Sequence, residues 1–283
     1  MIELTVALPL YKGKDIAWLA LESLCRQKDV NFKWELLIVE EKEDCYGLEK
    51  IKEYVSRLKQ VGCVRLDYVP LDRWVPLSDK WKHLATMASD TSECFLLQAA
   101  DCYAQPYRLK ETRDLFKKDK EIDWVQSEEG LFYDIYHKKG AIFDHSLCFI
   151  STGQGHKQHK CALNMAIKTS LIKKLFQARG VHAMRGVDGF LFRTLASLKG
   201  SSLKVEWNRS NNWKLGFDTD GLNNISWDRT FYIRDGRPPF KKLPDGEKVE
   251  DYIPADILSK LDDCYTAAKT NTLLHPNQQM PYG

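Results

Sequence analysis

Residues Glu93 to Leu109 read Glu-Cys-Phe-Leu-Leu-Gln-Ala-Ala-Asp-Cys-Tyr-Ala-Gln-Pro-Tyr-Arg-Leu. The stretch opens with an apolar run, Cys94 to Leu97, that is typical of a strand buried on both faces. Asp101 follows this run, and Pro106 begins a new amphipathic segment. A carboxylate just past the carboxyl end of a buried strand lies where open α/β sheets bind ligands. The stretch therefore predicts a buried strand, an aspartate that faces a ligand, and a helix.

Upstream of this stretch, apolar runs and helical segments alternate along the chain. Runs at 4–10, 34–39 and 64–69 are typical of strands, and segments with helical spacing of their apolar residues lie at 15–24 and 47–58. Strands separated by helices are joined as parallel strands through crossover connections. We therefore expect an α/β fold with a mostly parallel central sheet flanked by helices.

Downstream of Pro106 the pattern of elements changes. The sequence predicts a helix to about Lys118, a strand at 122–126, a hairpin within 130–150 around Lys138-Lys139-Gly140, helices at 163–177 and 187–198, a short strand at 203–206 and a last helix at 257–269. We expect one catalytic domain over 1–206, with a donor half at about 1–106 and an acceptor half at about 107–206. A C-terminal extension over 207–283 is expected to pack on the same domain.

The composition is that of an ordinary globular protein, and it excludes several classes. Of 283 residues, 43% are hydrophobic and 29% charged, and the net charge of +3 is too small to indicate nucleic-acid binding by itself. Eight cysteines at irregular spacings argue against a disulfide scaffold and favour a reducing compartment. No secretory signal and no apolar run long enough to span a membrane is recognised, so a cytoplasmic location is expected.

Four short motifs occur at ends of these predicted elements. The first strand ends in Ala7-Leu8-Pro9-Leu10-Tyr11, and the second ends in Val39-Glu40-Glu41. The third motif runs from Gln98 to Leu109, and the fourth runs from Arg185 to Arg193 as Arg-Gly-Val-Asp-Gly-Phe-Leu-Phe-Arg. Their order and spacing resemble those of the GT-A fold glycosyltransferases of the family 2 type, over about residues 4 to 200.

The two acidic motifs match that family only in part. Aligned on its proline, the third motif is similar to the family's metal-binding Asp-x-Asp, with Ala99 in the place of the first acid and Asp101 in the place of the second. The fourth is similar to the helix start that holds the family's catalytic base. Val187 stands there in place of a glutamate, while Asp188 and Arg193 match.

The resemblance implies transfer of a sugar from a nucleotide-diphosphate sugar, with UDP as the expected nucleotide, to an acceptor hydroxyl. It implies that Asp101 holds Mn²⁺ or Mg²⁺, which offsets the charge of the leaving diphosphate, and that Asp188 is the general base of an inverting reaction. A further metal ligand would be His182 or His275. The residues expected to bind the donor are Leu8, Pro9, Leu10, Tyr11, Glu40, Lys80, Ala100 and Asp101.

Each of these polar residues also has a purely structural interpretation. Asp101 could be a solvated turn aspartate, and Asp188 could cap its helix. Glu40 could be a strand-end acid in water, Tyr11 a plain loop tyrosine, and Lys80 a surface lysine rather than a phosphate ligand.

Two other functions remain open from the sequence. A nucleotide-sugar-binding protein with eroded catalysis would explain the two replaced acids. A sugar-nucleotide nucleotidylyltransferase would carry a glycine-rich loop with arginine after its first strand, whereas residues 8–14 hold one glycine and no arginine. The acceptor could be a glycan or a modified nucleic-acid base, bound by the segments 151–160 and 207–232. His156 and His159 lack nearby partners, so no zinc site is expected there.

Overall fold

The computed structural model describes residues 1–127, 129–135, 137–144, 150–151, 157–158, 165–178, 187–208, 216–220 and 240–274. Its centre is a seven-stranded sheet with the strand order β12-β6-β11-β4-β1-β2-β3. The strands are β1 (Leu4–Leu10), β2 (Trp34–Glu41), β3 (Cys63–Leu71), β4 (Cys94–Leu97), β6 (Trp124–Ser127), β11 (Ala166–Lys168) and β12 (Val205–Asn208). The strand β11 is antiparallel to both of its neighbours, and the remaining pairs are parallel. The predicted mostly parallel sheet is therefore confirmed.

Both faces of this sheet are covered by helices. They are α1 (Ala17–Cys25), α2 (Leu48–Lys52), α3 (Val55–Gln60), α4 (Leu77–Met87), α5 (Arg108–Lys118), α6 (Thr169–Ala178), α7 (Val187–Lys199) and α9 (Ala255–Leu274), with short 3-10 turns η1 (Gly13–Asp15), η3 (Gly200–Ser202) and η5 (Val249–Asp251).

Alternate residues of each central strand belong to two different apolar clusters, because successive side chains point to opposite faces. Val6 and Leu8 of β1 pack with residues of α1, α3, α5 and α9. Ala7 packs with residues of α4, α6 and α7 on the other face. Every residue of β1 and β2 is buried, which explains why their sequences are nearly continuous apolar runs.

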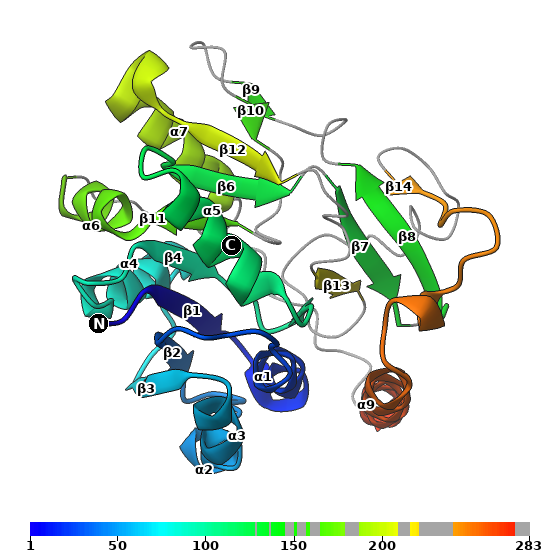
Figure 1. Ribbon diagram of the computed structural model, residues 1–283. Helices are drawn as coiled ribbons and strands as arrows, with labels where there is room; N and C mark the ends of the chain where they lie inside the picture. The colour runs from blue at the N-terminus through cyan, green and yellow to red at the C-terminus, as the bar shows by residue number, and fades with distance from the viewer. Residues whose placement is uncertain are drawn as a thin grey trace.

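A second, five-stranded sheet faces the carboxyl ends of the central strands, and the arrows of β1, β6 and β12 point toward it (Figure 1). It has the order β14-β8-β7-β13-β5 and consists of β5 (Cys102–Ala104), β7 (Glu129–Asp134), β8 (Lys139–Asp144), β13 (Gly216–Asp220) and β14 (Phe240–Lys241). A separate antiparallel pair is formed by β9 (Ile150–Ser151) and β10 (Lys157–Gln158). Because β5 directly follows the turn that holds Asp101, that turn joins the two sheets.

Two predicted elements are corrected by the structure. The predicted helix at 163–177 is a strand, β11, followed by α6, because Ala166 and Ile167 are fully buried between β4 and β6. The predicted hairpin is formed by β7 and β8, but Lys139 and Gly140 lie within β8. The reversal falls on the preceding residues, where Lys138 adopts a left-handed conformation with φ of 51°.

The C-terminal segment packs on the first sheet's core. Val249, Ile253, Ile257 and Leu261 belong to the apolar cluster of β1 and α1. Arg26, which follows the last residue of α1, also binds Asp256 of α9 through two hydrogen bonds. The division of the chain at residue 206 stays a prediction.

Within the described ranges, no helix has both the length and the apolar composition to cross a membrane.

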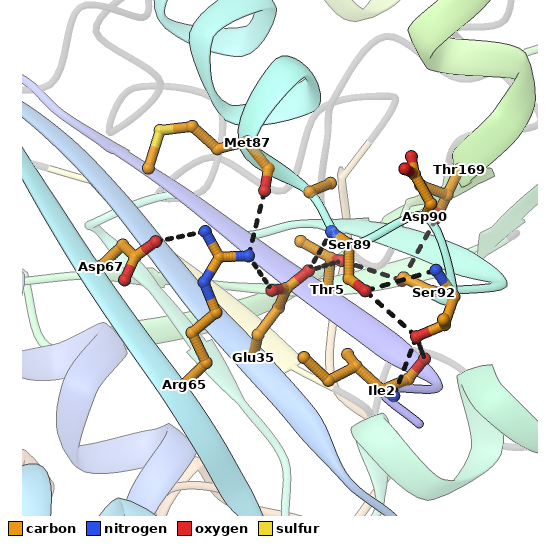
Figure 2. A network of polar contacts seen from close by, with 12 residues as sticks. Ile2, Thr5, Glu35, Arg65, Asp67, Met87, Ser89, Asp90, Ser92 and Thr169 are labelled. Atoms are coloured by element: carbon orange, nitrogen blue, oxygen red, sulfur yellow. Dashed lines mark hydrogen bonds and ion pairs between the residues drawn. The ribbon is translucent and has the colours of Figure 1, made fainter.

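A buried polar network joins the amino ends of the central strands to the turn between α4 and β4 (Figure 2). Glu35 of β2 is fully buried and accepts hydrogen bonds from the Thr5 hydroxyl at 2.6 Å, the Ser89 backbone at 2.7 Å and the Arg65 guanidinium at 2.8 Å. A buried carboxylate is tolerated only when such partners replace its water. The network therefore fixes β1, β2, β3 and α4 relative to one another.

We expect Glu35→Ala to lower the free energy of unfolding by about 3 kcal/mol, because it leaves buried donors and the Arg65 charge without their acceptor. Urea unfolding followed by circular dichroism measures the change. Glu247→Ala, at an exposed acid, is the matched control and should leave the midpoint unchanged. Equal midpoints for the two variants would contradict this role of the network.

Candidate functional site

The site lies where the strand order reverses. From β1 the chain proceeds to β2 and β3 on one side, and then returns to β4 on the other side. Ligands of open α/β sheets bind at such a switch point, outside the carboxyl ends of the strands. Tyr11 follows β1 and the turn 98–101 follows β4, so the structure brings these two predicted segments to the two sides of the switch point.

The end of β1 itself is core. Leu8 and Leu10 are fully buried in the apolar cluster of α1 and α9, and Pro9 is buried beside Val39. The first half-buried side chain after the strand is that of Tyr11. Of the four residues predicted here for donor binding, Tyr11 is thus the one that lines an open pocket.

Glu40 holds a loop in place. It is fully buried, and its Oε1 accepts a hydrogen bond from the backbone of Tyr46 at 2.7 Å. Its Oε2 accepts from the backbone of Gly47 at 3.1 Å and from the Tyr68 hydroxyl at 3.0 Å. The interpretation as a strand-end acid in water is therefore wrong. Since both oxygens are engaged within the protein, Glu40 positions the loop after β2.

The neighbouring acid, Glu41, forms a buried ion pair with Lys80. Lys80 is 2% exposed, also donates to the carbonyl of Leu10 at 2.6 Å, and lies 5.2 Å from the centre of the Tyr11 ring. Burial lowers the pKa of the Lys80 amino group, while the carboxylate of Glu41 opposes that shift. The interpretation of Lys80 as a surface lysine is wrong, because its amino group holds Glu41 and the end of β1.

A pocket of about 90 Å³ lies at the carboxyl ends of β1, β2 and β3. Residues of three loops line it: Tyr11, Lys12, Glu41, Lys42, Glu43, Asp72, Arg73 and Trp74. Trp74 is 48% exposed, and the Oε1 atom of Glu41 is buried without a hydrogen-bond partner among the described residues. The pocket is thus lined by two aromatic rings together with three basic and three acidic side chains.

Glu41, Arg73 and Trp74 were not predicted from the sequence. The available signal was the loop between Pro70 and Pro76, which contains Asp72-Arg73-Trp74 directly after a predicted strand. Loops that follow adjacent parallel strands meet at one edge of the sheet. A tryptophan and an arginine in such a loop are therefore candidates for ligand contact.

The turn after β4 is held by two hydrogen-bonded side chains, those of Gln98 and Arg108. Gln98 is fully buried and donates to the carbonyls of Ala99 at 3.0 Å and Cys102 at 2.6 Å, which closes the turn. Arg108 in turn donates to Gln98 Oε1 at 2.6 Å. Asp101 is half-buried within the turn, and Ala100 packs against the core.

The first turn of α7 carries Asp188. The last residue of α7, Lys199, binds Asp123, which directly precedes β6, so this helix ends at the amino edge of the sheet. A helix of this length spans about 20 Å. The side chain of Asp188 falls outside the described part of the chain, as do His182 and His275, so the convergence of Asp188 with Asp101 stays a prediction.

No group of three or more His, Cys, Asp or Glu side chains that could hold a metal ion occurs in the described ranges. In the described turn after β4, one carboxylate, that of Asp101, could ligate a metal. Mg²⁺ and Mn²⁺ are commonly bound by one or two carboxylates together with substrate phosphates. The residues therefore fit a metal that arrives with a phosphorylated ligand rather than one held by the protein alone.

A larger cleft, of about 460 Å³, lies at the opposite edge, beside the turn 90–93 and the start of α6. Its lysines are occupied: Lys173 binds Asp90, and Lys120 binds Glu93. This cleft is remote from the strand ends that carry the predicted site residues.

No protein-family model and no curated protein matches the sequence. The crystal structure of S. aureus TarS 1-349 in complex with UDP-GlcNAc superimposes with a TM-score of 0.57 at 12% identity, over 99% of this chain and 77% of that one. The longer S. aureus TarS structure gives a TM-score of 0.52 at 12% identity, over 77% of this chain and 37% of that one.

These likenesses show the fold. They confirm the predicted GT-A-type architecture, a mostly parallel sheet flanked by helices, and the chain spans about 37% of the length of the longer TarS chain.

We expect Lys80→Met and Glu41→Met each to lower the free energy of unfolding by about 3 kcal/mol, because each leaves one buried charge unpaired. The double variant should lose at least about 1 kcal/mol less than the sum, since it removes both charges. Urea unfolding of the four proteins measures this coupling. The exposed pair Lys52–Glu49, treated in the same way, should show none. Additive losses at Lys80 and Glu41 would mean that the pair is not coupled.

Proposed function

We propose that this protein is a glycosyltransferase that moves a sugar from a UDP-sugar to an acceptor hydroxyl. The observation that carries this proposal is the pocket at the carboxyl ends of β1, β2 and β3, where Tyr11, Trp74 and the unpartnered oxygen of Glu41 adjoin the switch point of the sheet. The fold likeness to TarS, whose crystal structures include complexes with UDP and UDP-GlcNAc, supports the same conclusion.

The pocket chemistry favours a nucleobase with an N–H group at its edge. Aromatic rings such as those of Tyr11 and Trp74 bind planar rings by stacking. A buried carboxylate oxygen without a partner gains a hydrogen bond when a ligand N–H meets it, and disfavours ligands that present an acceptor there. Uracil carries such an N–H at its N3 position and is the nucleobase that we propose for this pocket.

The diphosphate is proposed to lie between the pocket and the turn after β4. Lys12 and Arg73 supply positive charge at the pocket rim, where Lys42 is paired with Asp72. Asp101 would hold Mn²⁺ or Mg²⁺ together with the phosphates, and a divalent cation offsets the charge that grows on the leaving diphosphate. Leu8, Pro9, Leu10 and Ala100 would contact the donor through backbone atoms, because three of these side chains are buried and that of Ala100 packs against the core.

Asp188 is proposed as the general base that takes the acceptor proton. Its position in the first turn of α7 supports this role, because the partial positive charge at a helix amino end favours an ionised carboxylate. A base that activates the acceptor hydroxyl for direct displacement gives inversion at the sugar carbon. The acceptor, a glycan or a modified nucleic-acid base, is proposed to approach from the side of the second sheet.

A nucleotide-sugar-binding protein without transfer activity is the second candidate. Ala99 and Val187 occupy the places of two acids of the resembled family. Val187 is 2% exposed and packs in the apolar cluster formed by residues of α4, α6 and α7. The two candidates share the donor pocket and differ in the chemistry that follows.

We expect UDP to bind in the presence of Mn²⁺, and Tyr11→Ala or Trp74→Ala to weaken binding about ten-fold through lost stacking. Isothermal titration calorimetry measures the Kd for UDP of the unaltered protein and of each variant. Leu198→Ala, at an exposed apolar residue near the other end of α7, is the control and should bind as the unaltered protein does. If the unaltered protein bound no UDP, both candidates would be eliminated.

We expect release of UDP from a UDP-sugar to be stimulated by Mn²⁺, and Asp188→Asn to lower kcat about 100-fold or more while the Kd for UDP is unchanged. Asp101→Asn should instead weaken the response to Mn²⁺. A coupled assay for UDP, run over a Mn²⁺ series, separates these effects. UDP binding without any release of UDP from a UDP-sugar would favour the binding protein.

A further inference from the structure

Arg108 is a buried cation that has no counterion among the residues that the structure describes. It is the first residue of α5, is 1% exposed, and donates to Gln98 Oε1 at 2.6 Å and to the carbonyl of Leu97 at 2.8 Å. Its Nε atom has no hydrogen-bond partner, and none of the carboxylates described for this chain pairs with it. Burial lowers the pKa of Arg108 to about 10, so the guanidinium still carries its charge at neutral pH.

This placement is unfavourable for stability on two grounds. A buried charge without a counterion loses its water and receives no opposite charge in return. In addition, Arg108 begins a helix, where the partial charge of the backbone is already positive. The other buried cation of the site, Lys80, is compensated by Glu41. The electrostatic cost alone therefore favours a neutral residue at position 108.

The charge lies at the root of the turn that carries Asp101. Arg108 binds the last carbonyl of β4 and the side chain of Gln98, and Gln98 closes the turn through the carbonyls of Ala99 and Cys102. The backbone can extend by at most about 11 Å between residues 98 and 101. Within residues 98–102, Asp101 is the one acid of the sequence, since Ala99 is neutral.

We propose that Arg108 is a positioning residue for the donor diphosphate: it fixes the turn 98–102 and supplies a buried positive charge that is compensated when the diphosphate binds at the switch point. The inference rests on the proposed function and adds an element that the pocket residues do not provide. A nucleobase is recognised at Tyr11 and Glu41, whereas Arg108 acts on the phosphates. Its effect should therefore appear as a difference between phosphorylated and unphosphorylated ligands.

The test compares the affinities of UDP and uridine for Arg108→Met, Arg108→Gln and Arg108→Lys by isothermal titration calorimetry with Mn²⁺. The two neutral variants should bind UDP about ten-fold more weakly while uridine binding is unchanged, since a unit charge at about 10 Å in a partly buried site has an effect of that order. Arg108→Lys keeps the charge and should retain most of the UDP affinity. Thermal unfolding checks that each variant is folded before its affinities are compared; Arg108→Met should be the less stable of the neutral variants, because it leaves the acceptors of Gln98 and Leu97 without a donor.

An unchanged ratio of UDP to uridine affinity in either neutral variant would overturn the proposal, as would equal losses for both ligands, which indicate a damaged pocket. If Arg108→Met does not fold, Arg108→Gln decides, because it keeps a hydrogen-bond donor for Gln98 without the charge. Failure of the unaltered protein to bind UDP would overturn the proposed function itself. Binding that Tyr11→Ala weakens but the neutral Arg108 variants leave intact would overturn the present inference alone.

Discussion

The structure depends on the burial of both faces of its parallel strands. Every residue of β1 and β2 is buried, and alternate side chains enter two separate apolar layers. Such strands have no exposed face on which polar chemistry could be placed. Charged side chains are therefore confined to the strand ends, where Glu35 lies at one edge of the sheet and Glu40 and Glu41 lie at the other. The location of the candidate site follows from this constraint.

The same constraint made much of the fold predictable. Continuous apolar runs at 4–10, 34–39 and 94–97 predicted three central strands, and their alternation with helices predicted parallel pairing, as observed. The segment 165–168 was misassigned to a helix, because a short apolar run has no periodicity of its own. Only its neighbours, β4 and β6, make it a strand. The second sheet depends on pairings between segments as distant as β5 and β13, which no local pattern encodes.

The candidate site was predictable in position and less so in residue identity. The sequence pointed to the end of β2, and the prediction named Glu40 there, whereas Glu41 is the residue that lines the pocket. Adjacent residues of a strand face opposite sides of the sheet. Glu40 is therefore buried and holds the loop after β2, whereas the next residue, Glu41, lines the pocket. Lys80 was predicted to bind a phosphate or to lie in solvent, because lysine side chains are rarely buried. Its burial depends on the carboxylate of Glu41, 39 residues away in the sequence. Arg73 and Trp74 line the pocket together with residues from the ends of β1 and β2, and this arrangement exists only in the folded chain.

The two buried cations of the site show how such a fold divides its charges. Lys80 is neutralised by Glu41 and thereby ties the end of β1 to β2 and α4, so its charge serves the architecture. Arg108 has hydrogen-bond acceptors and no described counterion, so its charge remains available to an anion outside the fold. With Ala99 in the turn, one acid fewer opposes that anion. If the donor diphosphate binds at this turn as proposed, the guanidinium would leave less of its charge for a metal to offset, because part of the compensation would be built into the protein.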